Sequence, residues 1–211
     1  MKTEIVRIEW DGEDLGSLRK AVGILSRGGV IVYPTDTFYG LGASGYDAEA
    51  VRKIYRIKRR DEGKPLSLVI SDHRMLEDVA ADIPMELLPL AEAFWPGPLT
   101  IVLSASPRLP AALLGGSSTI GVRIPDLAWL RELVTAAGFP LTATSANLSG
   151  EMDTSVAGEV VRDFSGKVDL IVDGGDTPGG RPSTVLDLSV RPPAILRQGE
   201  VSRERLLPFL R

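Results

Sequence analysis

The strongest candidate binding segment lies between Arg52 and Lys64, where seven basic residues stand beside two acidic ones. The segment has a surplus of five positive charges in a chain whose net charge is -4, which leaves -9 for the remainder. Positive charge is therefore concentrated at one place in the sequence. Because an apolar run, Leu66–Ile70, follows directly, the pattern predicts a pocket for a small, highly charged anion.

Helical spacing separates the cations of this segment. Val51, Ile54, Tyr55 and Lys58 stand at positions i, i+3, i+4 and i+7, so Lys58 falls on the apolar stripe that faces the core. A buried ammonium group requires an anionic partner. Arg60, just beyond the helix, can point into the same space, and we predict a catalytic role for both residues.

The alternative is that the segment is a solvated helix end, whose cations are stabilised by the helix dipole. We expect this of the four cations that lie off the stripe, which are Arg52, Lys53, Arg56 and Arg59.

A second cluster of polar side chains lies between Thr142 and Gly150. Hydroxyl and amide groups at the end of a strand are typical of ligand sites in open α/β sheets. A turn in which Ser145 and Asn147 satisfy their own backbone explains the same residues. The sequence leaves both interpretations open.

Composition excludes several kinds of chemistry. The chain has no cysteine, which removes disulfides, thiolate nucleophiles and zinc-thiolate sites. Its one histidine, His73, follows a predicted strand at a position where Ser71 or Asp72 can cap a helix, so we expect an exposed first-turn residue. A pI near 5.2 argues against a nucleic-acid duplex as the main partner, although a local groove for RNA remains allowed.

The glycines from Gly40 to Gly45 spell G-x-G-x-x-G, the dinucleotide-binding fingerprint. In that fold the first glycine follows the strand directly, whereas here the six residues 34–39 intervene. We therefore reject a Rossmann site.

The elements that must position these residues are short β-type runs alternating with helical ones. The first ten residues alternate like an edge strand, without the apolar region of a signal peptide, and no run is long enough to span a membrane. Further strands are predicted at 30–33, 66–70, 99–103, 119–124, 141–144, 170–172, 184–188 and 195–197. Helices are predicted at 14–27, 48–59, 75–81, 85–94, 127–137, 156–164 and 203–210.

This order predicts an α/β fold in which helices flank a twisted mixed sheet, because β-β connections late in the chain break a regular βαβ alternation. We expect one cytoplasmic domain spanning residues 1–211. The proline- and glycine-rich run from Gly174 to Pro182 is long enough to be a binding loop.

Seven short motifs together resemble the YrdC-like family of L-threonylcarbamoyladenylate synthases. They run through residues 34–199 in the order P-T-D-T-F-Y-G-L-G, K-x-R with K-P-L, W-P-G-P-L-T, T-I-G-V-R-I-P, S-A-N, S-T-V-L-D and I-L-R-Q-G. The combination is far more specific than any single motif. It implies a single YrdC-like domain with a large, concave and locally basic cavity.

The resemblance implies an enzyme that joins L-threonine, bicarbonate and ATP, with Mg²⁺, into threonylcarbamoyl-AMP and pyrophosphate. Its product would serve a downstream tRNA threonylcarbamoyltransferase complex, in the N6-threonylcarbamoyl modification of adenosine 37. No protein nucleophile is needed, so the lack of cysteine is no obstacle. Positioned cations, with Mg²⁺ held mainly by ATP, can supply the charge neutralisation.

The resemblance also implies site residues. The ATP site would be formed by Lys58, Arg60, Lys64, Thr119, Ser145, Asn147, Asp153 and Arg197. The threonine site would be formed by Thr37, Arg123, the backbone of Ala143, and Ser183. Arg123 is the natural bidentate partner of the threonine carboxylate.

Three positions depart from the family pattern. Val69 stands where many members have a histidine, Lys64 where many have asparagine, and Asp153 where serine is frequent. Two alternatives remain: a paralogous member of the superfamily with altered activity, or a non-enzymatic module that binds RNA weakly in the cavity.

Overall fold

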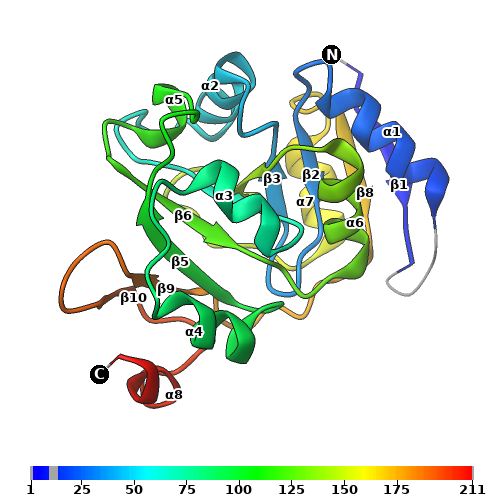
Figure 1. The fold of residues 1–211 in the computed structure, drawn as a ribbon. Coiled ribbons are helices and arrows are strands. Elements are labelled where there is room, and N and C mark those ends of the chain that lie inside the picture. The colour runs from blue at the N-terminus through cyan, green and yellow to red at the C-terminus, as the bar shows by residue number, and fades with distance from the viewer. Residues whose placement is uncertain (1, 10–13, 211) are drawn as a thin grey trace.

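A ten-stranded mixed sheet forms the centre of the molecule in the computed structural model, which describes residues 2–9 and 14–210 (Figure 1). The strand order is β1-β8-β2-β3-β7-β4-β6-β5-β9-β10. The strands are β1 (Glu4–Arg7), β2 (Ile31–Tyr33), β3 (Gly40–Gly42), β4 (Ser67–Val69), β5 (Leu99–Ser104), β6 (Thr119–Arg123), β7 (Leu141–Ser145), β8 (Leu170–Asp173), β9 (Thr184–Asp187) and β10 (Ala194–Arg197).

Helices cover both faces of the sheet, because successive strand residues point to opposite sides. They are α1 (Leu15–Leu25), α2 (Ala48–Lys58), α3 (Leu76–Val79), α4 (Leu87–Phe94), α5 (Ala111–Leu114), α6 (Ala128–Ala137), α7 (Ala157–Phe164) and α8 (Arg203–Leu206), with short 3₁₀ turns η1 (His73–Met75) and η2 (Leu207–Phe209). In β2, Ile31 and Tyr33 pack with α1 and α6, while Val32 packs with the core that includes α2 and α4. Figure 1 shows α1 beside α6.

The predicted mixed α/β architecture is confirmed by the sheet pairings. Four strand pairs are parallel, among them β1 with β8 and β4 with β6, and the other five are antiparallel. The N-terminal strand lies at an edge, as its alternating pattern predicted, although Met1 and Trp10 fall outside the described residues. Of the helices in the described part of the chain, none has the length and hydrophobicity of a membrane-spanning helix.

The run from Gly40 to Gly42 is a strand, β3, which the sequence patterns did not predict. Glycine is required at both ends of β3 because the Tyr33 ring of the neighbouring strand lies across it. A Cβ atom on Gly40 would lie 2.7 Å from a Tyr33 ring carbon, and one on Gly42 would lie 2.4 Å away. The first two fingerprint glycines therefore make room for an aromatic ring, which agrees with the rejection of a Rossmann site.

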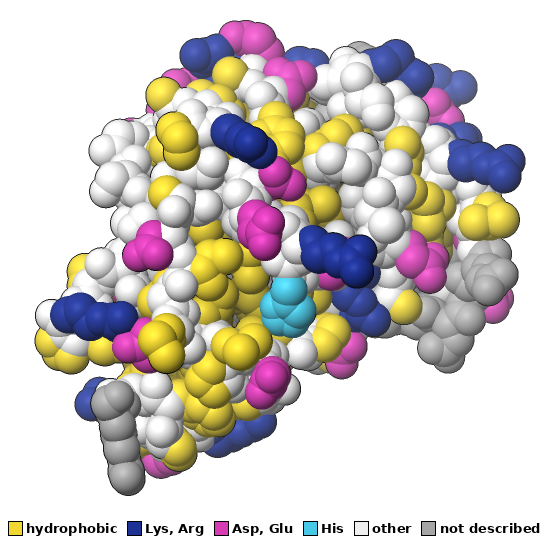
Figure 2. Space-filling model, in the orientation of Figure 1, with side chains coloured by type: hydrophobic (Ala, Val, Ile, Leu, Met, Phe, Trp, Pro, Cys, Tyr) yellow, Lys and Arg dark blue, Asp and Glu magenta, His cyan; other side chains and the backbone are white. Residues whose placement is uncertain are grey.

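Most other predicted elements are observed, with small shifts at their ends. The helix predicted at 75–81 is shorter than expected, since α3 ends at Val79 and Ala80 is extended. Helix α5 was not predicted, because four residues are too few for helical periodicity to appear. His73 is exposed and begins η1, with Asp72 as the N-terminal cap; it is the single cyan side chain in Figure 2.

Candidate functional site

A pocket of about 220 Å³ opens where β2, β3, β4, β6, β7 and β9 meet. Eight of the twelve predicted site residues line it: Thr37, Arg60, Arg123, Ala143, Ser145, Asp153, Ser183 and Arg197. Residues separated by up to 160 positions in the sequence therefore surround one cavity. We call the part around Asp36, Thr37 and Arg123 the Arg123 end, and the part around Lys58, Arg60, Ser145, Asn147 and Asp153 the Lys58 end.

The other four predicted residues do not line the pocket. Lys58 and Asn147 lie behind it, in contact with Ser145. Thr119 is half-buried and exchanges a hydrogen bond with the Ser117 hydroxyl at 2.9 Å. The Lys64 side chain is exposed.

Helix α2 brings Lys58 to the pocket by the spacing that its sequence predicts. Asp47 caps the helix by accepting from the backbone N–H groups of Glu49 and Ala50 at 2.9 and 3.1 Å. The buried face of the helix consists of Ala50, Val51, Ile54, Tyr55 and Lys58. Lys58 is 1% exposed, so it occupies the core stripe as expected.

The partners of Lys58 differ from the sequence-based expectation. That expectation was an anion, but the ammonium donates to three neutral oxygens: the backbone oxygens of Ser145 and Asn147 at 2.5 and 2.8 Å, and Asn147 Oδ1 at 2.7 Å. Three hydrogen bonds to protein oxygens satisfy the buried ammonium without neutralising it, so an anionic ligand as its charge partner stays a prediction. Lys58 thereby fixes the turn that follows β7.

Burial, reinforced by the nearby charge of Arg60, lowers the pKa of Lys58 to about 8, while Asp153 acts in the opposite direction. A bound anion at this end would favour the protonated form. The ammonium group is therefore sensitive to what occupies the pocket.

Arg60 is turned back towards the pocket by the residue before it. Arg59 ends α2 in the left-handed region, with φ 50° and ψ 40°, a conformation that costs a non-glycine residue about 1 kcal/mol. The Arg60 guanidinium donates to the backbone oxygens of Lys64 and Pro65 at 3.4 and 3.0 Å. As at Lys58, the acceptors are neutral.

The S-A-N turn supports both interpretations that the sequence left open. Ser145 Oγ donates to Asn147 Oδ1 at 2.8 Å, and Asn147 Nδ2 donates to the Glu151 backbone oxygen and to Asp153 Oδ1 at 2.7 and 3.1 Å. The turn therefore satisfies much of its own polar capacity. At the same time Ser145 and Asp153 face the pocket.

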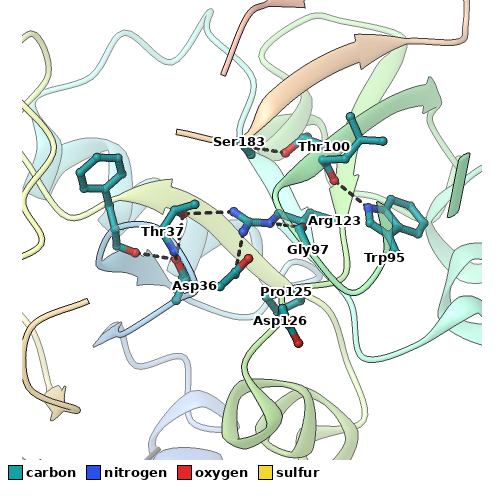
Figure 3. A network of polar contacts seen from close by, with 12 residues as sticks. Asp36, Thr37, Trp95, Gly97, Thr100, Arg123, Pro125, Asp126 and Ser183 are labelled. Atoms are coloured by element: carbon teal, nitrogen blue, oxygen red, sulfur yellow. Dashed lines mark hydrogen bonds and ion pairs between the residues drawn. The ribbon is translucent and has the colours of Figure 1, made fainter. Parts of the chain in front are cut away.

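Arg123, on β6, is buried at the opposite end (Figure 3). Its Nε donates to the Gly97 backbone oxygen at 2.9 Å, and its Nη1 donates to Thr37 Oγ1 at 3.3 Å. Its Nη2 forms an ion pair with Asp36 Oδ1 at 2.6 Å. The guanidinium thus already has a carboxylate partner within the protein.

Asp36 is the site residue that sequence reasoning missed. The signal was present, because Asp36 is the only charged residue in the P-T-D-T-F-Y-G-L-G motif. Its distance to Arg123 depends on how β2 and β6 are arranged in the sheet, which the motif does not reveal.

Arg197, on β10, lies between the two ends. It donates to the Ser183 backbone oxygen from Nη2 and Nε at 2.8 and 3.2 Å, and to Ser183 Oγ at 3.1 Å. Burial lowers the pKa of Arg197, with an opposing effect from Asp153 and a small further lowering by Arg123. Ser183 in turn exchanges a hydrogen bond with Thr100 at 2.9 Å.

The loop from Gly174 to Pro182 closes one side of the pocket. The Tyr39 hydroxyl donates to the Gly175 backbone oxygen at 2.6 Å, and the Gly179 N–H donates to the Thr37 backbone oxygen at 2.8 Å. These bonds fix the loop against the connection between β2 and β3, which carries the P-T-D-T motif, and Pro182 lines the pocket. Val69, one of the departures from the family pattern, is a buried part of the same lining.

Comparisons with known proteins identify the family to which the chain belongs. Residues 23–199 match the Sua5/YciO/YrdC family model, whose description reads "Telomere recombination". Over 189 residues the chain is 41% identical to the "Threonylcarbamoyl-AMP synthase" of Pyrococcus abyssi, covering 90% of this chain and 56% of that protein. The chain thus spans little more than half the length of that relative.

Two solved structures share the fold over almost the entire chain. The structure of P. abyssi Sua5 complexed with L-threonine matches with a TM-score of 0.95 and 38% identity, covering 99% of this chain and 61% of that one. The structure of E. coli YciO matches with a TM-score of 0.88 and 32% identity, covering 99% of this chain and 100% of that one.

Proposed function

Because the chain belongs to the Sua5/YciO/YrdC family, we propose that it is a threonylcarbamoyl-AMP synthase. The observation that carries the proposal is the division of one pocket into a cationic end and an end with a paired arginine. Such a pocket suits two different substrates, a polyphosphate and an amino acid. The P. abyssi relatives, one named for this activity and one complexed with L-threonine, support it.

We assign ATP to the Lys58 end. Its triphosphate would lie near Arg60, Ser145 and Arg197, with Lys58 and Asn147 behind Ser145. Lys64 and Thr119, which lie outside the pocket lining, would reach the nucleotide only at its margin. Cations with neutral partners retain their charge for phosphate.

We assign L-threonine to the Arg123 end. The threonine carboxylate would accept hydrogen bonds from the remaining N–H groups of Arg123. The threonine hydroxyl and amine would contact Thr37, Ser183 and the backbone of Ala143. Val69 gives this end an apolar wall in place of a histidine.

The reaction needs no residue that bonds covalently to substrate. The threonine amine attacks the bicarbonate carbon, water leaves, and a carbamate forms. A carbamate oxygen then attacks the α-phosphorus of ATP, a phosphorus–oxygen bond forms, and the bond to the pyrophosphate leaving group breaks. The work of Lys58, Arg60 and Arg197 is to hold the triphosphate in line and neutralise its charge.

Magnesium fits this site as an ion held mainly by ATP. Among the described residues that line the pocket, Asp153 is the only carboxylate, and no group of three or more potential metal ligands occurs in the described part of the chain. Mg²⁺ in nucleotide sites commonly takes one or two carboxylates together with substrate phosphates. When bound, it would neutralise charge on the phosphates.

The proposal is tested by supplying purified protein with L-threonine, bicarbonate, Mg²⁺ and ATP. We expect pyrophosphate together with an adenylate whose formation requires threonine. Equal turnover with serine, or without an amino acid, would contradict the proposal. Transfer of the product to a tRNA threonylcarbamoyltransferase complex would be the next step, tested by adding that complex and an unmodified tRNA that reads codons starting with A.

A further inference from the structure

Asp36 has no role in the reaction as proposed and does not line the pocket, yet it forms an ion pair with Arg123, which does. Its side chain is 13% exposed and that of Arg123 is 9% exposed. Within residues 2–9 and 14–210, neither Asp36 Oδ1 nor Arg123 Nη2 has a well-aligned hydrogen-bond partner, although the two atoms are 2.6 Å apart. The contact between these two buried atoms is therefore an ion pair, in which each charge offsets the other.

Asp36 alone matches the charge of Arg123. The other acceptors of this guanidinium are the Gly97 backbone oxygen and the Thr37 hydroxyl, which are neutral. For the part of the chain that the structure describes, no second carboxylate oxygen lies within 4.0 Å of Arg123. Within the Arg123 end, the Asp36 carboxylate is therefore the group that offsets the charge of the Arg123 guanidinium.

The other cations of the site, unlike Arg123, have no carboxylate within ion-pair distance. No carboxylate oxygen of a described residue lies within 4.0 Å of Lys58, Arg60 or Arg197. Asp153 acts electrostatically on Lys58 and Arg197, but it lies beyond ion-pair distance of both. One pocket thus contains neutralised and unneutralised cations side by side.

The presence of a carboxylate beside Arg123, and its absence beside the other cations, favours different ligands at the two ends. A phosphate at Arg123 would lie next to the Asp36 carboxylate, and repulsion between these like charges would offset the attraction to arginine. A zwitterionic amino acid has no net charge, and its ammonium group offsets the repulsion between its own carboxylate and that of Asp36. We propose that Asp36 is a specificity-determining residue, which admits the zwitterionic amino acid to the Arg123 end and excludes phosphate from it. This inference rests on the proposed function.

The test titrates inorganic phosphate into the protein by isothermal titration calorimetry, with no amino acid present. In D36N we expect a phosphate site that is at least ~10-fold tighter than any in the wild type at Arg123. Adding Arg123→Gln to the D36N variant should abolish this site, and D36E should behave as wild type. D126N is the matched control, because the exposed Asp126 lies near Asp36 and Arg123 (Figure 3). Its partner is Arg131, at 3.5 Å.

A second measurement uses L-threonine as the titrant, with and without phosphate. Phosphate should leave the threonine affinity of the wild type unchanged and should weaken it at least ~10-fold in D36N. Equal phosphate binding by D36N and wild type overturns the proposal, as does competition between phosphate and threonine in the wild type. If D36N does not fold, D36S and the wild-type competition experiment decide the question.

The two proposals fail in different ways. A wild-type protein that binds no threonine contradicts the proposed function, while the titrations with phosphate alone still test the role of Asp36.

Discussion

At the Arg123 end of the pocket, a guanidinium lies 2.6 Å from a carboxylate; at the Lys58 end, an ammonium and a guanidinium donate only to neutral oxygens. All of these cations have hydrogen-bond partners. They differ in whether an acidic group neutralises their charge. Hydrogen bonding and neutralisation are separate, because carbonyl oxygens accept from N–H groups without removing the net charge. The comparison teaches that the ligand preference of each end depends on the identity of the acceptors.

The largest expected effect tests the neutralised end. Arg123→Gln should lower kcat/KM for L-threonine more than ~100-fold, since it removes the carboxylate partner and leaves Asp36 buried without a cation. The KM for ATP should change little. Steady-state kinetics with each substrate varied in turn measures both. A loss that falls equally on both substrates would contradict the division of the pocket.

At the other end, Lys58→Ala should lower the turnover rate more than ~10-fold and the free energy of unfolding by about 2–4 kcal/mol, because three oxygens lose their donor and a cavity forms. Urea denaturation measures the stability change. Lys58→Met is the matched control, since it preserves most of the packing and none of the charge. If Lys58→Met retains full activity, the charge of Lys58 has no part in catalysis.

Arg60→Ala should reduce the rate more than ~10-fold, chiefly through ATP, because Arg60 lines the pocket with its charge unmatched. Arg52→Ala, in the helix α2 that ends just before Arg60, is the control. Arg52 is a surface residue paired with Glu49, and such pairs contribute at most ~1 kcal/mol to stability. Similar losses in both variants would indicate a general effect of positive charge on α2, without a specific site.

The smallest effect concerns pH. The pKa of Lys58 is lowered to about 8, so the ammonium is present below this pH and is lost as the pH rises through it. We therefore expect kcat/KM for ATP to fall above pH 8, since this parameter reports ionisations of the free enzyme. Arg60→Ala should move the midpoint upward, because Arg60 lowers the pKa of Lys58. Asp153→Asn should move it downward, because Asp153 raises that pKa. A profile that stays flat well above pH 8 would exclude this role for Lys58.

Local patterns were sufficient for most of the fold. Helix α2 has its cap, its apolar stripe and its C-terminal end within thirteen consecutive residues, 47–59, and each signal acts over one or two turns. Strand β3 could not be predicted in this way. Its glycines are typical of a turn, and their actual cause is the Tyr33 ring on the adjacent strand. Pairing between strands depends on tertiary contacts that a single segment does not contain.

The sequence by itself determined that Lys58 faces inward, that no thiol or histidine pair is available for catalysis, and that the motifs between residues 34 and 199 belong together. Helical periodicity and composition are sufficient for the first two statements, because these depend on residue type and short spacing, and the third rests on the resemblance to a known family. Only the tertiary structure decided which cations of the site have a carboxylate partner and which have neutral oxygens. Asp36 and Arg123 are 87 positions apart, and the oxygens that bind Lys58 lie 87 and 89 positions away from it. Electrostatic interaction depends on distance in space, and the order of strands in the sheet sets that distance.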